Sequence, residues 1–233
     1  MSARTDETPA KVLIVDDHAF LRRGLAEIID DLPEAVVCGE AAGATEALEQ
    51  IELCRPDVVI VDISLGDGNG LELTREIKTK WPETKVLVSS MHDEALFAER
   101  ALRAGALGYV SKSDDVDTFI AALRRVLDGQ VSLSARMTDR LLTRVVAGAG
   151  SPARSPMEAL SNRELEVFEL IGIGRSTKEI AALLDLSRKT VETYREHIKT
   201  KLNLRNGAEL TRHAVQWVYE RSSAEPAASA DVP

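Results

Sequence analysis

Short apolar runs recur through the first half of the chain and indicate buried β-strands. They do not alternate with polar residues, which is typical of strands covered on both faces of a parallel sheet. The runs are Val12–Val15, Val36–Cys38, Val58–Val61, Val86–Val88 and Leu107–Val110. Segments with helical spacing lie between them, and the clearest has apolar residues at Val116, Phe119, Ile120, Leu123, Val126 and Leu127. Strands that alternate with helices in this way predict an α/β fold, a doubly wound five-stranded parallel sheet.

The second half of the chain has a helical pattern throughout. Ser161–Glu164 and Ser176–Glu179 both have the Ser-x-x-Glu spacing of a capping box, and each precedes an apolar run with helical spacing. A tight turn at Asp185–Ser187 separates the second of these helices from a third. The apolar positions of the third helix are Val191, Tyr194, Ile198 and Leu202. The pattern predicts a small all-α domain after the α/β domain.

The third helix of this domain has a charged outer face. Its residues include Arg188, Glu192, Arg195, Glu196 and Lys199. An ordinary solvated face is the simpler explanation of such a run. However, a short helix, a three-residue turn and a longer charged helix form a helix-turn-helix, and residues 187–205 carry a local net charge of +4. The spacing and the charge together favour a DNA-binding surface.

The pattern and composition of the sequence change after Gln130, which indicates a domain boundary. Met137, Leu141 and Val145 predict a short linker helix from about Ser134 to Val146, and residues 148–156 form a Gly/Pro/Ser-rich tether that would let the second half move. The predicted organisation is therefore a first domain at 10–130, a linker at 131–156, a second domain at 157–221 and a disordered tail at 222–233.

The charge of the chain is divided unevenly between the two halves. The chain has 233 residues and a net charge of −9, which separates into −11 for residues 1–130 and +2 for residues 131–233. This asymmetry suggests two different tasks. No apolar run approaches the roughly 20 residues that span a membrane, and the short polar N-terminus has no signal-peptide pattern, so we expect a cytoplasmic protein. Cys38 and Cys54 are expected to be reduced core residues, and the scattered histidines suggest no metal site.

Polar side chains follow four of the five predicted strands. Asp16 and Asp17 follow the first strand, Asp62 the third, Ser90 the fourth and Lys112 the fifth. The carboxyl ends of parallel strands meet at one edge of the sheet, where such folds bind ligands. A single acid there is often only part of a solvated turn, but three crowded carboxylates favour Mg²⁺. A carboxylate beside Mg²⁺ and a lysine can attack a phosphoryl group.

Residues 11–128 resemble the receiver domain of two-component response regulators, which has a flavodoxin-like fold. The matching motifs are Val-Asp-Asp-His at 15–18, Val-Asp-Ile-Ser-Leu at 61–65, Ser-Ser-Met-His at 89–92 and Gly-Ala-Leu-Gly-Tyr-Val-Ser-Lys at 105–112. The resemblance implies that Asp62 accepts a phosphoryl group from a histidine kinase and that Lys112 pairs with the phosphate. It also implies a Mg²⁺ site made by Asp16, Asp17, Asp62 and the backbone carbonyl of Ser64, with Asp17 the more direct ligand of the acidic pair.

The same resemblance implies that Ser90 is the switch hydroxyl and that Tyr109 moves between exposed and inward positions. Tyr109 also has a simpler interpretation as a strand-end aromatic residue. The family usually has proline where this chain has Gly66, so we expect the loop after Asp62 to be more flexible than usual. Gly68 and Gly70 do not make a dinucleotide site, because the third glycine of that motif is absent and no Walker lysine follows.

The second half resembles the LuxR-type DNA-binding domain, as found in NarL-type regulators. The matching motifs are Leu-Ser-Asn-Arg-Glu-Leu-Glu-Val at 160–167, Lys-Glu-Ile-Ala at 178–181 and Ser-Arg-Lys-Thr-Val-Glu-Thr-Tyr at 187–194. The resemblance implies that the third helix enters the major groove with Glu192, Thr193 and Glu196 nearest the bases. The residues expected to contact phosphates are Lys178, Arg188, Lys189, Lys199 and Lys201.

A fourth helix, expected from Gly207 to Glu220, would support dimerisation. It presents Leu210, Ala214 and Trp217, although Leu210 and Trp217 suit the core equally well. The chain is thus identified as a response regulator rather than an enzyme. Its expected partners are a histidine kinase, paired half-sites in promoter DNA, and a second copy of the chain when it is phosphorylated or DNA-bound.

Two other functions compete with this interpretation. A phosphotransferase of the haloacid dehalogenase type also uses an aspartate nucleophile, but it needs a second acid two residues later, where this chain has Ser64. A regulator that works through partner binding alone would not need phosphorylation. The three acids argue against that possibility without excluding it.

Overall fold

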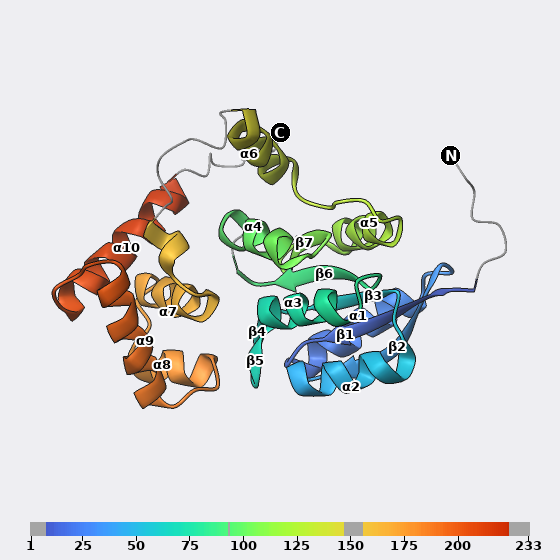
Figure 1. Ribbon diagram of the computed structural model, residues 1–233, viewed down its shortest axis with the longest axis horizontal. Helices are drawn as coiled ribbons and strands as arrows, with labels where there is room; N and C mark the ends of the chain where they lie inside the picture. Colours follow the sequence, from blue (N-terminus) through green and yellow to red (C-terminus); the bar gives the residue numbers. More distant parts are fainter. Residues whose placement is uncertain (1–7, 93, 147–155, 224–233) are drawn as a thin grey trace, which may run out of the picture. The chain divides into compact units, whose positions relative to one another are not determined.

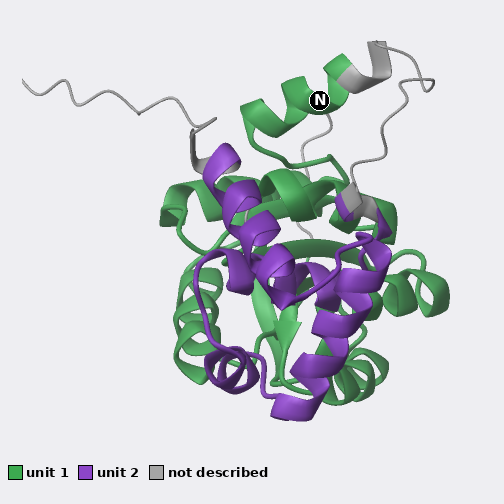
Figure 2. Cartoon of the chain, turned by 90° about the vertical axis from the view of Figure 1, so that its left-hand side faces the viewer, with its two compact units in different colours: residues 1–151 green, residues 152–233 purple. Residues whose placement is uncertain are grey.

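The computed structural model of the chain describes residues 8–92, 94–146 and 156–223 (Figure 1). The chain divides into two compact units, residues 1–151 and 152–233, which Figure 2 shows in different colours. The tether predicted at 148–156 lies outside the described residues except for Pro156, and the predicted tail lies outside them except for its first two residues.

The first unit is built on a five-stranded sheet with the strand order β2-β1-β3-β6-β7. The strands are β1 (Ala10–Val15), β2 (Ala35–Ala41), β3 (Val58–Val61), β6 (Lys85–Ser90) and β7 (Gly108–Ser111). All four neighbouring pairs are parallel. Every residue of β3 is buried, as expected for a central strand covered on both faces. The doubly wound parallel sheet predicted from the apolar runs is therefore confirmed.

Helices cover both faces of this sheet. They are α1 (Ala19–Asp30), α2 (Ala44–Cys54), α3 (Gly70–Lys80), α4 (Glu94–Ala104) and α5 (Val116–Leu127). α1 and α5 share one core, in which Ile29 and Leu123 pack with residues of the strands, including Ile14 and Ile60. α3 lies between α2 and α4, and their buried side chains include Ile51, Ile77 and Phe97.

The segment between β3 and α3 forms a small hairpin. β4 (Ser64–Leu65) pairs with β5 (Gly68–Asn69) in an antiparallel arrangement. The Asn69 side chain accepts a hydrogen bond from the Leu71 amide, and this bond caps α3. The loop that follows Asp62 is thus tied to the start of a helix.

α6 (Ala135–Val146) occupies the segment that was predicted to be a linker helix. Met137 is buried, and both the amide and the hydroxyl of Ser134 donate to the Glu94 carboxylate of α4. Arg140 donates to the Ala95 carbonyl at 3.2 Å. This helix is therefore packed against α4 of the first unit, which the sequence pattern did not predict. The domain limits proposed from the sequence stay predictions.

The second unit contains the 3-10 turn Pro156–Ala159 and the helices α7 (Asn162–Gly172), α8 (Thr177–Leu183), α9 (Arg188–Lys201) and α10 (Gly207–Ser223). Both predicted capping boxes are present, at the starts of α7 and α8. Asp185 adopts a left-handed conformation (φ 48°) in the turn between α8 and α9, and Ser187 caps α9. The described part of the chain contains no helix with both the length and the apolar character needed to cross a bilayer.

The contacts of α10 correct the expected dimer face. Leu210 and Ala214 are fully buried, and Trp217 packs edge-on against Phe168 of α7 at 5.3 Å between ring centroids. These three residues belong to the core of the second unit. The outward face of the same helix is formed by Ala208, Thr211, Arg212, Val215, Gln216 and Tyr219, which line a shallow, mainly apolar hollow.

Candidate functional site

Two of the three predicted acids lie buried at the carboxyl edge of the sheet. Asp16 follows β1 and is 2% exposed, Asp62 follows β3 and is 4% exposed, and Asp17 is exposed. Ligand atoms of these residues and of His18 all lie within 4.8 Å of one another. The strand-end argument therefore placed the three acids together correctly.

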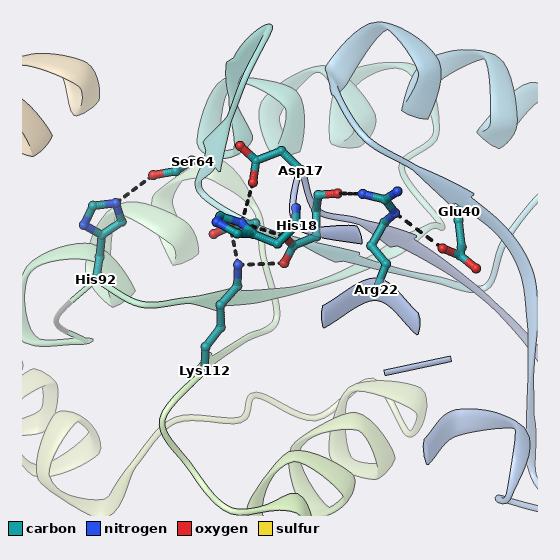
Figure 3. Close-up of polar contacts among 9 residues, drawn as sticks. Asp17, His18, Arg22, Glu40, Ser64, His92 and Lys112 are labelled. Atoms are coloured by element: carbon teal, nitrogen blue, oxygen red, sulfur yellow. Dashed lines mark hydrogen bonds and ion pairs between the residues drawn. The ribbon is translucent and has the colours of Figure 1, made fainter. Parts of the chain in front are cut away.

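Lys112 joins the two buried acids. Its Nζ lies 2.6 Å from an oxygen of Asp16 and 2.6 Å from an oxygen of Asp62 (Figure 3). Burial raises the pKa of Asp62, Lys112 lowers it and Asp16 raises it again, so that the net direction is upward. Asp62 therefore releases its proton less readily than a solvated carboxyl. A further cation beside Asp62 would favour the ionised form, which is the nucleophile.

His18 is a member of this cluster that the sequence did not single out. Its Nδ1 lies 2.6 Å from an oxygen of Asp17, and its backbone amide donates to Asp16 at 2.8 Å (Figure 3). Arg22 donates to the Asp16 carbonyl and lies 3.4 Å from Glu40. These contacts fix the chain between β1 and α1. The spacing along the sequence does not reveal them, because His18 starts a helix and its ring turns back toward the acids.

The predicted switch residues form a second group of contacts. Ser90 is fully buried, and its hydroxyl accepts from the His92 amide at 3.3 Å. Tyr109 is buried, and its hydroxyl donates to the His92 carbonyl at 2.5 Å, so its ring is in the inward position. The His92 ring lies 2.9 Å from the Ser64 hydroxyl (Figure 3). His92, which was predicted only as part of a motif, therefore links the loop after Asp62 to both switch residues.

The loop after Asp62 is hydrogen-bonded to α2, which its glycine content did not predict. The Asp67 carboxylate accepts from the amides of Ala44 (2.7 Å) and Thr45 (3.1 Å) in the first turn of α2. Burial works against ionisation here, but these two backbone bonds prevail and lower the pKa of Asp67. An acid at a helix N-terminus is also stabilised by the helix dipole. The tip of the loop is therefore hydrogen-bonded to α2, and the expected effect of Gly66 on loop flexibility stays a prediction.

The donor set suits a hard divalent cation. It consists of three carboxylates, two of them buried, at an edge where the Ser64 backbone also lies. Carboxylate and carbonyl oxygens are the ligands that Mg²⁺ prefers, and a dication offsets the repulsion between crowded acids. The cluster is thus compatible with Mg²⁺.

The second unit presents the predicted DNA-contacting residues on α8 and α9. Lys178, Arg188, Lys189, Glu192, Thr193, Glu196 and Lys201 are exposed, and Lys199 is half-buried. Within the described residues, Lys178, Arg188 and Lys189 have no carboxylate within 4.0 Å. These three cations are therefore available to an external anion.

The other charged candidates already have partners within the domain. Glu192 accepts from the Thr177 hydroxyl at 2.8 Å, which ties α9 to the start of α8. Lys199 lies 2.8 Å from Glu196. Lys201 lies 2.6 Å from Glu164, the buried acid of the first capping box. Burial opposes ionisation of Glu164, but hydrogen bonds from Lys201 and Ser161 outweigh it and lower the pKa. The structure thus gives Glu192 and Lys201 structural contacts beside their expected roles at DNA.

Two family models match separate parts of the chain. The model for the response regulator receiver domain matches residues 12–124. The model for bacterial regulatory proteins of the luxR family matches residues 158–214. The chain is also 38% identical over 210 residues to the oxygen regulatory protein NreC of Staphylococcus carnosus, a match that covers 88% of this chain and 97% of that protein. NreC of Staphylococcus epidermidis is 36% identical over 211 residues, with the same coverage.

Solved structures show the same architecture. RcsB from Salmonella enterica serovar Typhimurium, bound to promoter rprA in the presence of the phosphomimetic BeF3−, is 25% identical, with a TM-score of 0.58 over 89% of this chain and 99% of that one. A LuxR-family two-component response regulator from Aurantimonas sp. is 33% identical, with a TM-score of 0.55 over 60% of this chain and 99% of that one. The similarity to RcsB extends over both halves of the chain.

Proposed function

This chain belongs to the two-component response regulators that join a receiver domain to a LuxR-type DNA-binding domain, and we propose that phosphorylation of Asp62 controls its binding to promoter DNA. The observation that carries the proposal is the buried Asp62 carboxylate, which lies 2.6 Å from Lys112 at the carboxyl edge of the sheet. The family consists of transcription regulators, so the competing phosphotransferase interpretation is set aside. We propose a cytoplasmic location, because a regulator that binds promoter DNA must reach the chromosome.

The residues around Asp62 support its role as the phosphoryl acceptor. Lys112 is held by two carboxylates, so its ammonium is already in place to pair with oxygens of an incoming phosphoryl group. We assign Mg²⁺ to Asp16, Asp17, Asp62 and the Ser64 carbonyl. When bound, Mg²⁺ supplies positive charge that neutralises the transferring phosphoryl group. The donor of that group is a cognate histidine kinase, as the receiver domain implies.

The contacts of His92 support a route from Asp62 to the surface of the receiver. A phosphate on Asp62 attracts the Ser90 hydroxyl, which now accepts from the His92 amide. Moving Ser90 therefore disturbs the backbone whose carbonyl holds Tyr109. α4 begins two residues after His92, and its Glu94 holds Ser134 beside α6. We propose that α4 and α6 transmit this conformational change along the chain toward the DNA-binding unit.

The phosphorylation step can be tested directly with acetyl phosphate and Mg²⁺. We expect the full chain to gain the mass of one phosphoryl group, because an activated aspartate accepts it from a small donor. Asp62→Asn should gain none, since its side chain is no longer a nucleophile. Asp128→Asn, at an exposed acid after α5, should be phosphorylated like the native chain. Intact mass spectrometry checks all three, and equal phosphorylation of Asp62→Asn and the native chain would refute the assignment.

The second unit binds DNA through the α8–α9 helix-turn-helix in this proposal. α9 enters the major groove, where Thr193 and Glu196 face the base edges, and Lys178, Arg188 and Lys189 contact phosphates. The outward apolar face of α10, which includes Val215 and Tyr219, would join two copies on paired half-sites. This arrangement replaces the dimer face first expected from the sequence.

Lys189→Ala is expected to weaken DNA binding without changing sequence preference. Its ammonium is exposed in the first turn of α9, and the loss of one phosphate contact should lower the affinity about 3- to 10-fold and reduce the salt slope by about 1. Fluorescence anisotropy at several salt concentrations, with DNA selected by binding to the full chain, measures both. Lys80→Ala, in the receiver half, is the charge-matched control. If both variants bind like the native chain, α9 does not contact phosphates through Lys189.

A further inference from the structure

The two cysteines of the chain lie side by side at the outer edge of the receiver domain. Cys38 Sγ and Cys54 Sγ are 2.9 Å apart, although one belongs to β2 and the other to the last position of α2. Both residues are only half-buried. Neither takes part in the phosphoacceptor site or in DNA binding, so the proposed function does not explain their contact.

The local backbone brings these thiols together. β2 pairs with β1 through Val37 and Gly39, and the register shift leaves Cys38 as the extra residue between them. Such a bulge turns a side chain away from its regular alternation. Gly39 makes room for α2, because a Cβ there would lie 3.0 Å from the Gln50 side chain of that helix. Cys54 Sγ also lies 3.0 Å from the Gln50 carbonyl, which orients it one turn back along α2.

We propose that Cys38 and Cys54 form a reversible thiol–disulfide site that ties α2 to the edge strand β2. The segment between them is short, and the sulfur atoms need to approach by less than 1 Å to reach the length of a disulfide bond, about 2.0 Å. A soft metal ion held linearly between the two sulfurs would need them to move apart instead. The geometry therefore favours a covalent bond over metal binding.

The reaction is a thiol–disulfide exchange with a small-molecule disulfide. Burial and the neighbouring Cys54 raise the pKa of Cys38 to about 12, so Cys38 stays protonated at rest. In the first step the Cys54 thiolate attacks the small disulfide and forms a mixed disulfide, releasing one small thiol. Cys38 then loses its proton and attacks the Cys54 sulfur, which releases the second small thiol. The protein loses two protons and two electrons, and the small disulfide is reduced to two thiols.

Oxidised glutathione provides the test on the full chain. We expect the native protein to lose both free thiols together, to lose the mass of two hydrogen atoms and to remain a monomer on non-reducing gels. Dithiothreitol should restore both thiols. Cys38→Ser should instead keep glutathione on Cys54, because no second thiol is present to displace it. Two glutathione adducts on the native protein, disulfide-linked dimers, or two unreacted thiols would each overturn the proposal.

A second measurement follows the thermal stability of the receiver domain instead of the state of its thiols. The thermal unfolding of the receiver can be followed through Trp81, which lies at the end of α3, when Trp217 is replaced by phenylalanine in every protein compared. Oxidation of the native chain should raise the unfolding midpoint by about 5–10 °C. The disulfide closes the loop between Cys38 and Cys54 and so restricts the conformations of the unfolded chain. Cys54→Ser treated in the same way should show no rise. An unchanged unfolding midpoint in oxidised native protein that has lost both thiols would also contradict the proposed disulfide between α2 and β2.

Discussion

Gly70→Ala is expected to destabilise the receiver domain by about 2–3 kcal/mol or more. A Cβ at this position would lie far inside contact distance of the Asp62 carbonyl oxygen and 2.8 Å from Val61 Cγ1. The first contact is with backbone, so it cannot be relieved by turning a side chain. The Gly70 amide also donates to the Ile63 carbonyl at 2.8 Å, which leaves α3 little room to move away.

Urea denaturation of the full chain, followed through Trp81, measures this effect. The second tryptophan, Trp217, can be replaced by phenylalanine in both proteins so that only the receiver is seen. Gly68→Ala is the matched control two residues earlier, because its Cβ would make one ordinary contact, 3.5 Å from Ala44. We expect Gly68→Ala to unfold close to the native midpoint. Equal midpoints for Gly70→Ala and the native chain would mean that α3 does not approach Asp62 this closely.

Arg163→Met is expected to destabilise the DNA-binding domain by about 3–5 kcal/mol. Arg163 lies 2.6 Å from Glu166, whose side chain is fully buried, and it also donates to the Leu184 carbonyl at 3.2 Å. The substitution removes the cation that faces a buried carboxylate. It also removes a bond between α7 and the end of α8, which sets the geometry of the helix-turn-helix.

The same denaturation experiment in a Trp81→Phe background reports this domain alone through Trp217. Arg175→Met is the matched control, because Arg175 lies 3.6 Å from Glu179 and both side chains are about half exposed. Exposed pairs of this kind contribute little, so the control should change stability by less than about 1 kcal/mol. Similar losses of stability for Arg163→Met and Arg175→Met would show that burial of Glu166 does not increase the cost of removing its ion-pair partner.

Much of the receiver site was predictable because parallel strands bring their carboxyl ends to one edge. That rule alone placed Asp16, Asp62 and Lys112 together before any contact was known. It did not find His18, whose ring turns back from the start of a helix, or Asp67, whose partners are amides of α2. Hydrogen bonds across loops depend on backbone directions that residue spacing does not encode.

The helices of the second half illustrate a different limit of sequence patterns. Capping boxes were predicted correctly, since Ser161 and Glu164 act within one turn. The role of the apolar residues of α10 stayed open, because Leu210, Ala214 and Trp217 are apolar whether they serve the core or an interface. Only the packing of α10 on α7 decides between these roles.

The most direct test of the account is DNA binding by the native chain and Asp62→Asn, each with and without acetyl phosphate and Mg²⁺. The DNA is a site selected by binding to the treated native chain, and fluorescence anisotropy gives the affinity. If phosphorylation of Asp62 controls the output, the treatment should strengthen binding by the native chain at least about fivefold and leave Asp62→Asn unchanged. Equal binding by both proteins under both conditions would contradict phosphorylation control and favour a regulator that acts through partner binding alone.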